Sequence, residues 1–172
     1  MWFGTRNGLN RFDGTVFKVF RNDVNDPQSI GSNSVLSLFE DRKEHLWVGT
    51  YKGVYIYNAT QETFSLFMKI PAGEVRYIAG DLHNNIWLVA NYVLYRYNTV
   101  TNSIRSYPCP NTQAIAVIVA ENGTVWCATS AGQVKKYDAA GDLFINYSIA
   151  SLFKDRDTAF IQTIYPLTDT TI

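Results

Sequence analysis

Cysteine, histidine and an excess of charge of either sign are all scarce in this sequence of 172 residues. The chain has 2 Cys and 2 His, and its 15 Lys and Arg equal its 15 Asp and Glu. A chain without net charge has no basic surface that releases counterions from a nucleic acid, and it is not drawn to an anionic membrane. These shortages argue against nucleic-acid-binding, membrane-surface and metal-centred proteins.

Long hydrophobic runs are also missing. The longest, AIAVIVA at 114–120, is far shorter than the roughly 18 to 20 residues that span a bilayer. The N-terminal MWFGTRNG has neither the cationic start nor the apolar stretch of a secretion signal, so we expect no targeting segment in this chain. Cys109 and Cys127 lack C-x-x-C spacing, and we expect free thiols at both positions.

Aromatic residues, in contrast, make up 15% of the chain and recur at a regular spacing. The four tryptophans are 45, 40 and 39 residues apart, at Trp2, Trp47, Trp87 and Trp126. A second aromatic follows each of them by ten residues, or by eleven in the last case, at Phe12, Tyr57, Tyr97 and Tyr137. A period of about 40 residues is typical of the four-stranded blades of a β-propeller.

Each repeat contains apolar runs for four strands. In the second, LWVGT and GVYIYN predict a hairpin around a Gly-containing turn, a run with Phe64 and Phe67 follows, and EVRYIA precedes the next Trp. We therefore predict an all-β fold, a β-propeller fragment of four blade-equivalents with four antiparallel strands each. The repeats span about 1–45, 46–85, 86–124 and 125–172 of a single domain.

The repeated aromatic positions are predicted to form the core. In GVYIYN, Val54 and Ile56 point to one face of the strand while Tyr55 and Tyr57 point to the other. Apolar residues on both faces favour blades that are covered by neighbours on both sides. We assign this structural role to Trp2, Trp47, Trp87, Trp126, Phe12, Tyr57, Tyr97 and Tyr137.

The two ends of the chain supply parts of one further blade. Residues 2–20 carry three outer strands, and residues at about 159–165 carry an inner strand. This blade, split between the N- and C-termini, joins the ends of one chain or joins two chains head to tail as a homodimer.

The stretch at 22–58 resembles the two-component regulator propeller repeat. It has an Asn/Asp/Pro-rich loop, a Ser-rich segment, an acidic residue and then a W-[IV]-G-T-x-x-G-[LV] hairpin, which Trp47 to Gly53 match. The later repeats depart from this pattern, as WLVANYV and WCATSAG. The resemblance implies a segment of the periplasmic sensor region of a hybrid two-component histidine kinase/response regulator of carbohydrate-degrading gut bacteria, responding to an oligosaccharide.

Recurrent acidic residues favour a structural role over catalysis. Asp41, Asp81, Glu121 and Asp169 occupy similar points of the repeats, and a single active site does not repeat, so we expect them to accept backbone N–H groups in turns. His45 and His83 fall in the same turns, as solvated residues. Without a phosphate loop or a nucleophile motif, we predict no catalytic residues, no metal and no cofactor.

Two alternative functions stay open. One is a propeller lyase or glycosidase that acts on polysaccharide, with Glu74 and Arg76 at the start of an inner strand as its candidate residues. The other is a scaffold propeller that binds protein partners.

The turns of the Trp hairpins vary most between repeats, and they carry the candidate ligand-binding residues. Aromatic faces beside planar polar groups commonly hold sugars, which selects Arg6, Tyr51, Lys52, Asn91 and Tyr92. The competing interpretation is that these are ordinary solvent-facing loop residues.

Overall fold

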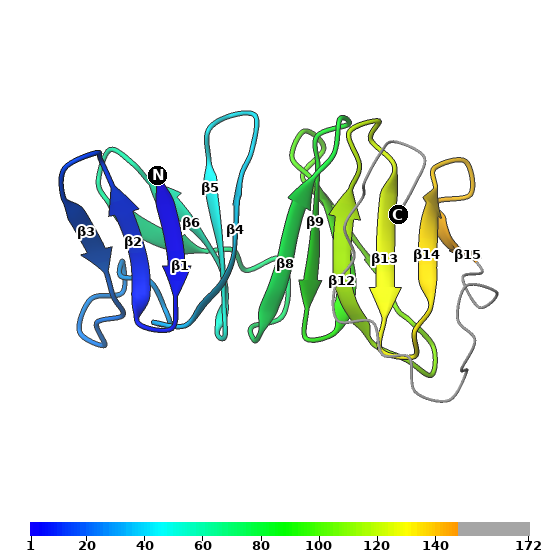
Figure 1. Ribbon diagram of the computed structural model, residues 1–172, viewed down its shortest axis with the longest axis horizontal. Helices are drawn as coiled ribbons and strands as arrows, with labels where there is room; N and C mark the ends of the chain where they lie inside the picture. Colours follow the sequence, from blue (N-terminus) through cyan, green and yellow to red (C-terminus); the bar gives the residue numbers. More distant parts are fainter. Residues whose placement is uncertain (148–172) are drawn as a thin grey trace. The chain divides into compact units, whose positions relative to one another are not determined.

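The computed structural model describes residues 1–147, whose regular elements are all β-strands (Figure 1). The first seven are β1 (Trp2–Thr5), β2 (Gly8–Phe12), β3 (Phe17–Phe20), β4 (Val35–Glu40), β5 (Leu46–Thr50), β6 (Gly53–Asn58) and β7 (Thr63–Leu66). The others are β8 (Val75–Gly80), β9 (Asn85–Ala90), β10 (Val93–Asn98), β11 (Ser103–Tyr107), β12 (Ala114–Val119), β13 (Val125–Thr129), β14 (Val134–Asp138) and β15 (Leu143–Tyr147). Nowhere in this part of the chain is there a helix with the length and hydropathy needed to cross a membrane.

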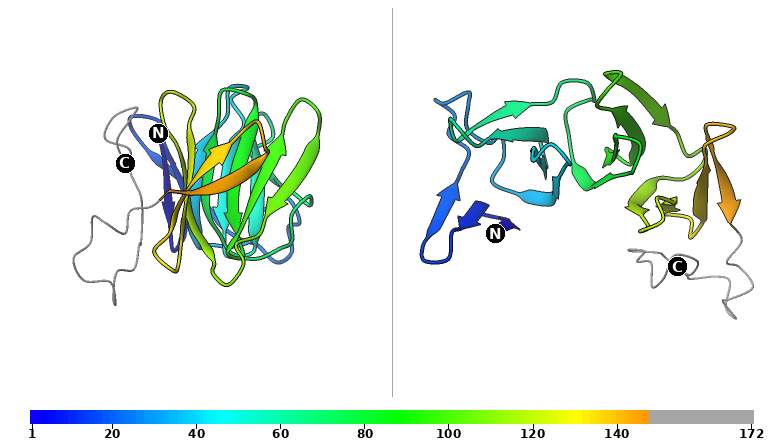
Figure 2. Two further views of the ribbon diagram at one scale, coloured as in Figure 1. Left: turned by 90° about the vertical axis from the view of Figure 1, so that its right-hand side faces the viewer. Right: turned by 90° about the horizontal axis from the view of Figure 1, so that it is seen from above.

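The strands form antiparallel sheets that correspond to blades, as Figure 2 shows from two further directions. Three sheets have four strands, in the orders β4-β5-β6-β7, β8-β9-β10-β11 and β12-β13-β14-β15, and the fourth is β1-β2-β3. Each four-stranded sheet consists of the strand before a Trp, the strand that carries the Trp, and the two strands that follow. The predicted all-β fold with four-stranded blades is confirmed, whereas the inner strand at 159–165 and Asp169 lie outside the described residues.

The chain divides into two compact units at a point inside β8. Unit 1 is Met1–Ile78, and unit 2 begins at Ala79. Each unit is described by itself below. The predicted single domain with its four repeat boundaries stays a prediction.

Three of the four strands that carry tryptophan are the most deeply buried. Every residue of β5, β9 and β13 is buried, including Trp47, Trp87 and Trp126, whereas Trp2 is half-buried. Of the second aromatic set, Tyr57 is buried, but Phe12, Tyr97 and Tyr137 are only half-buried. The Tyr97 hydroxyl donates to Asn102 Oδ1 at 2.9 Å, in an exposed position.

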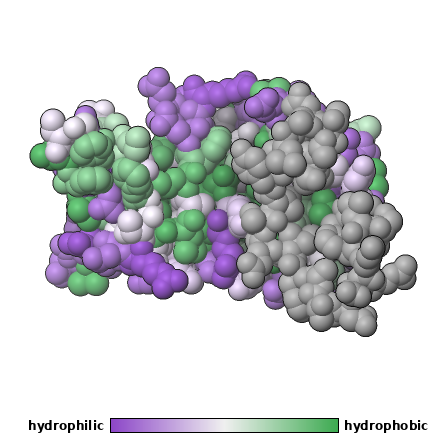
Figure 3. Space-filling view, in the orientation of Figure 1, coloured by the Kyte–Doolittle hydropathy of each residue, from purple (hydrophilic) through white to green (hydrophobic). Residues whose placement is uncertain are grey.

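The three-stranded sheet exposes several apolar side chains. The exposed fractions of its side chains are 41% for Phe3, 60% for Phe17 and 41% for Val19. Hydrophobic residues are accordingly visible over β1–β3 in the space-filling view (Figure 3). In the described part of the chain, β1 pairs with a strand on one side only.

Unit 1 holds its two sheets together with a cluster of four rings, one arginine and one glutamate, which we call the unit 1 clamp. The ring centroids lie 4.9 to 5.8 Å apart among Trp2, Phe20, Tyr57 and Phe64. The Arg11 guanidinium lies 5.7 Å from the Trp2 ring centroid. It donates to the Tyr57 hydroxyl at 3.0 Å and to Glu62 at 2.8 Å. Arg11 comes from β2 and Tyr57 from β6, so the clamp joins neighbouring blades.

Unit 2 repeats this arrangement as the unit 2 clamp. Its ring centroids lie 4.9 to 6.0 Å apart among Trp87, Tyr107, Tyr137 and Phe144. The Arg96 guanidinium lies 5.7 Å from the Trp87 ring centroid and donates to Asp142 at 2.8 and 3.2 Å. Arg11 and Arg96 occupy the same register, each opposite the Trp of its own sheet. In the second repeat Ile56 takes that register position, so the clamp does not recur in every blade.

The glycine of W-x-G-T allows close approach between neighbouring blades. A Cβ at Gly49 would lie 2.1 Å from Ser37 Oγ and 2.7 Å from the Val75 carbonyl oxygen, both too short for any side chain. The later repeats place Val89 and Ala128 at this position. The strand that begins the blade after Val89, β12, starts with Ala114, whereas β4 and β8 start with Val35 and Val75. A larger residue at the glycine position is therefore accompanied by a smaller residue at the start of the next blade, and the packed volume stays similar.

Aspartate residues in two of the turns anchor the tryptophans. The carboxylate of Asp41 accepts the Trp47 indole N–H at 3.0 Å and the His45 backbone N–H at 3.0 Å. Asp81 accepts the Trp87 indole N–H at 2.8 Å in the same way. The expected backbone bonds are therefore present at both positions, and the bond to the indole is an addition that the repeat pattern did not indicate.

Glu121, which the sequence analysis grouped with Asp41 and Asp81, does not occupy the same turn position as these two aspartates. Ala120 donates its N–H to Thr124 in the same turn bond that Asp41 and Asp81 make, so Ala120 holds the aspartate position. Glu121 is one residue further along and exposed. Spacing to Trp, six residues in the first two cases, identifies the correct residue.

We expect Asp41→Ala to lower the free energy of unfolding by about 2 kcal/mol at pH 7, because it removes charge-assisted bonds to partly buried donors. Burial raises the pKa of Asp41, but the bonds from Trp47 and His45 outweigh it and lower the pKa below its ordinary 3.8. The stabilisation is therefore complete above pH 3.8 and is lost as the pH falls through the lower folded-state value. Urea unfolding at several pH values measures this difference.

Ala120→Asp is the reciprocal variant, since it offers Trp126 the carboxylate that the other repeats have. We expect it to stabilise the chain by about 1 kcal/mol. An Asp41→Ala variant as stable as wild type at pH 7 would contradict the anchoring role of the carboxylate.

Candidate functional site

The turns of the Trp hairpins are held in shape by the threonine of W-x-G-T. In β5–β6, the Thr50 hydroxyl donates to the Gly53 carbonyl at 2.9 Å and accepts the Lys52 N–H at 3.1 Å. In β1–β2, Thr5 makes the equivalent bonds to Gly8 and Asn7, at 2.8 and 3.0 Å. The positive φ values of the two glycines, 139° and 119°, close both turns. The residues between Thr and Gly are thereby fixed on rigid supports.

These turns are bonded to the loops that lead into the inner strands. The Tyr51 N–H donates to the Ser34 carbonyl at 3.4 Å, and the Ala114 N–H donates to the Tyr92 carbonyl at 2.9 Å. Within each unit, the hairpin turns and inner-strand loops therefore form one continuous surface, which we call the turn surface. This is the location that the sequence predicted for a ligand.

All five candidate ligand-binding residues are exposed on the turn surface. Unit 1 carries Arg6, Tyr51 and Lys52, and unit 2 carries Asn91 and Tyr92. The exposed fractions are 52% for Tyr51 and 38% for Tyr92, so each presents a ring to solvent. Their role in binding stays a prediction.

The turn at Asn91 and Tyr92 has an unusual backbone. Both residues have positive φ, 49° and 63°, as the central pair of a type I′ hairpin turn requires. Asn is favoured there, but the second position usually holds glycine, and a tyrosine in this conformation is strained. Strain of this kind tends to be kept where the side chain has a function.

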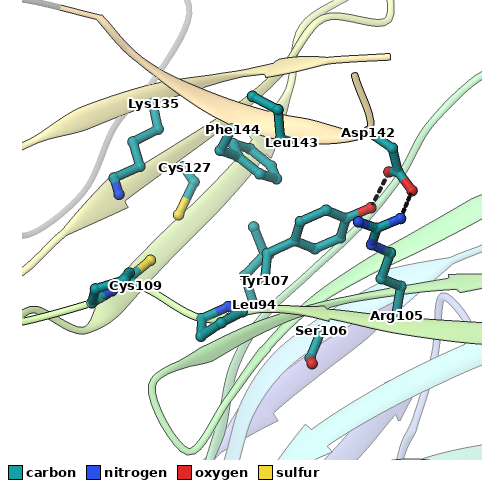
Figure 4. A pocket seen from close by; sticks show the side chains of 12 residues that line it. Leu94, Arg105, Ser106, Tyr107, Cys109, Cys127, Lys135, Asp142, Leu143 and Phe144 are labelled. Atoms are coloured by element: carbon teal, nitrogen blue, oxygen red, sulfur yellow. Dashed lines mark hydrogen bonds and ion pairs between the residues drawn. The ribbon is translucent and has the colours of Figure 1, made fainter. Parts of the chain in front are cut away.

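Unit 2 also contains two cavities that the sequence did not indicate. A cavity of about 410 Å³ lies beside the turns at Asp81 and Asn122, with His83, Arg96 and Lys136 in its lining. A second, of about 300 Å³, lies between β11 and β13–β15 and has Arg105, Tyr107, Cys109, Cys127, Lys135 and Asp142 in its lining (Figure 4). Neither cavity includes a predicted ligand-binding residue. We call the second one the cysteine cavity.

Asp142 lines the cysteine cavity and is a shared acceptor for several donors. It accepts the Tyr107 hydroxyl at 2.5 Å and pairs with Arg105 (Figure 4). It also accepts the Tyr137 hydroxyl at 2.6 Å. Burial raises the pKa of Asp142, but the bonds from the two hydroxyls and from Arg96 outweigh it and lower the pKa to about 2. Burial and the bond to Asp142 raise the pKa of Tyr107. Asp142 is therefore ionised at neutral pH, and it is bonded to Arg96, Tyr107 and Tyr137 of the unit 2 clamp.

The acids and histidines of the turns are likewise committed to local contacts. His45 Nδ1 lies 3.1 Å from the Asp41 oxygen that holds Trp47, and both His45 and His83 are exposed. Glu74 and Arg76, the candidates for an enzyme, form an ion pair with each other at 2.9 Å. Among residues 1–147, no group of three or more His, Cys, Asp and Glu is placed to hold a metal ion.

The fold is that of a β-propeller. The WD40 β-propeller domain of Doa1 superposes with a TM-score of 0.63 at 13% identity, over 84% of this chain and 48% of that one. The extracellular domain of BT3049 from B. thetaiotaomicron, described as a hybrid two-component system, gives a TM-score of 0.72 at 21% identity, over 84% and 21%. The structure of a streptogramin B lyase gives 0.65 at 15%, over 86% and 50%. At these identities the likenesses establish the fold alone.

Sequence comparison finds two short matches. Residues 29–52 match the model of the two-component regulator propeller. A 30-residue stretch is 57% identical to histidine kinase P4 of Formosa agariphila. That match covers 17% of this chain and 2% of the kinase, so the chain spans a very small part of its curated relative.

Proposed function

We propose that this chain is a segment of the extracytoplasmic sensor propeller of a hybrid two-component regulator, and that it binds a ligand without catalysis. The repeat at residues 29–52 carries this proposal, because it matches the model of the two-component regulator propeller. The similar fold of the BT3049 extracellular domain supports it. A periplasmic location and a histidine kinase elsewhere in the parent protein follow from the same resemblance.

The ligand that we propose is an oligosaccharide held on the turn surface. In unit 1, the exposed Tyr51 ring offers a flat apolar face for a sugar ring, and Arg6 and Lys52 offer hydrogen bonds to its hydroxyl groups. In unit 2, Tyr92 and Asn91 offer the same combination on that unit's own turn surface. Ligand binding then favours one arrangement of the sensor and so biases the kinase.

Tyr92→Gly separates a binding role from a structural one. Glycine relieves the positive φ of this turn, so we expect stability to be unchanged or to rise by about 1 kcal/mol. Loss of the ring is expected to weaken oligosaccharide binding by about tenfold, equivalent to 1.4 kcal/mol. Titration calorimetry with a panel of neutral and acidic oligosaccharides measures the affinity, and thermal unfolding measures the stability.

The matched control is Asn84→Gly, which changes another exposed residue of positive φ in the β8–β9 turn. We expect it to leave affinity unchanged. Equal affinity of wild type and Tyr92→Gly would remove Tyr92 from the site. Turnover of any glycan by the purified chain would instead favour the enzyme alternative, with Glu74 and Arg76 as the residues to test.

We also propose that the open side of β1 receives another strand, within one chain or from a second copy. The apolar surface of β1–β3 supports this, because an uncovered strand edge beside exposed Phe3 and Phe17 is prone to association. Light scattering over a range of concentrations decides between a monomer of 19.5 kDa and a homodimer of twice that mass.

A further inference from the structure

The two cysteines of the chain line the same cavity. Cys109 lies in the loop between β11 and β12, Cys127 lies in β13, and both are free thiols. Figure 4 shows their sulfur atoms directed toward each other, with the Lys135 ammonium on the same side of the cavity. Because the residues are 18 positions apart without a recognisable motif, the sequence alone did not indicate this proximity.

The environments of the two thiols differ in the way that a reactive pair requires. Cys127 is 1% exposed, whereas Cys109 is half-buried and can be reached from solvent. A hydrogen bond from the Cys127 thiol, together with the positive charge of Lys135, outweighs burial and lowers the pKa of Cys109 to about 7. The same bond and burial raise the pKa of Cys127. The Cys127 thiol also lies 3.5 Å from the Ala128 carbonyl, a second acceptor for its proton.

We propose that Cys109 and Cys127 are a redox-active pair that forms a reversible disulfide, with Cys109 as the attacking thiol and Cys127 as the resolving thiol. The oxidant is a low-molecular-weight disulfide of the glutathione type. An accessible thiolate beside a buried partner thiol is the usual arrangement of redox-responsive cysteines. This inference does not depend on the proposed ligand of the turn surface.

The exchange proceeds in two balanced steps. The Cys109 thiolate attacks one sulfur of the small disulfide, so a protein–small-thiol bond forms and one small thiolate leaves. Cys127 then loses its proton to a released thiolate and attacks Cys109 Sγ, which expels the second small thiolate. Counted from the two thiols, the protein loses two protons and two electrons, and the small disulfide takes them up and is reduced to two thiols.

The new bond would tie the β11–β12 loop to β13 beside the unit 2 clamp. It replaces two thiols with a cross-link in the wall of the cysteine cavity, so the cavity changes with the oxidation state of its surroundings. Charged groups from the neighbouring elements are Lys135 of β14, Arg105 of β11 and Asp142. Lys135 favours the thiolate of Cys109, while Arg105 and Asp142 compensate each other.

The test uses the full chain, fully reduced and then treated with oxidised glutathione at pH 7.5. Mass spectrometry is expected to show wild type with two hydrogens fewer, no retained glutathione and no thiol left to alkylate. The Cys127→Ala variant is expected to stop at one glutathione on Cys109, because the resolving thiol is gone. The Cys109→Ser variant is expected to remain unmodified while folded.

Alkylation kinetics give an independent measurement. The rate of iodoacetamide reaction at Cys109 is expected to be half-maximal near pH 7 in wild type. In Cys127→Ala the midpoint moves to higher pH, and the rate at pH 7 falls by about tenfold. Wild type that retains glutathione, or that stays fully reduced, overturns the proposal without reference to any variant. Oxidation of Cys109→Ser at the wild-type rate also overturns it.

Discussion

Trp87→Ala is expected to lower the free energy of unfolding by about 3 to 5 kcal/mol, because it truncates a large side chain in the core. The Trp87 side chain is completely buried, and its ring contacts Tyr107, Tyr137 and Phe144 at centroid distances of 4.9 to 5.7 Å. Truncation leaves a cavity among three rings and removes one of the donors to the buried Asp81 carboxylate. Guanidinium unfolding followed by circular dichroism measures the loss.

Trp2→Ala is the matched control, because Trp2 holds the equivalent place in the unit 1 clamp but is half-buried. We expect a smaller loss, since part of the ring is already in contact with water. Trp47→Ala is expected to cost about 3 to 5 kcal/mol as well, because Trp47 is 2% exposed and its ring packs against Phe67 at a centroid distance of 5.1 Å. A Trp87→Ala variant within 1 kcal/mol of wild type would contradict the placement of this ring in the core.

The regular spacing of tryptophan was enough to predict the fold, because each blade repeats one pattern of burial. The strands around Trp47 fall where LWVGT and GVYIYN placed them, at Leu46–Thr50 and Gly53–Asn58. A turn that recurs between repeats is also predictable from spacing, as Asp41 and Asp81 show. These features are local, so a single sequence contains the information that specifies them.

Contacts between blades were not predictable in the same way. The partners of Arg11 and Arg96 are Glu62 and Asp142, which are 51 and 46 residues away. The period of about 40 residues does not identify these pairs, because the second repeat has Ile56 in place of the arginine and so forms no clamp. The exchange of glycine for Val89 was visible as a departure, but its compensation by Ala114 required the structure.

The candidate site likewise has local features that the sequence predicted and contacts between distant residues that it did not. Exposure of Tyr51 and Tyr92 follows from their place in hairpin turns, which spacing gives. The cysteine cavity joins residues of β11, β13 and β14 that no short motif connects. A comparison of residues 1–78 with residues 79–147, each as a pair of repeats, would have aligned Arg11 with Arg96 and Glu62 with Asp142.

Removing the carboxylate of the unit 2 clamp is the second large expected effect. Asp142 accepts hydroxyl donors from Tyr107 and Tyr137 and pairs with Arg96, and its side chain is only 27% exposed. Asp142→Ala leaves Tyr107, Tyr137, Arg96 and Arg105 without their common acceptor. It also leaves the Arg96 charge beside three rings without this counterion. We expect the free energy of unfolding to fall by about 2 to 3 kcal/mol, allowing for partial exposure to solvent.

A double-mutant cycle of Arg96→Ala and Asp142→Ala isolates the pair. We expect a coupling energy of about 1 kcal/mol, since the two groups are in direct contact and partly screened. Because the folded-state pKa of Asp142 is lowered from 3.8 to about 2, the coupling is complete above pH 3.8 and is lost as the pH falls toward 2. Additive single-mutant losses at pH 7 would show that Arg96 acts only through its contacts with the rings. In that case the clamp would be an aromatic cluster covered by an arginine, and Asp142 would stabilise the tyrosine hydroxyls alone.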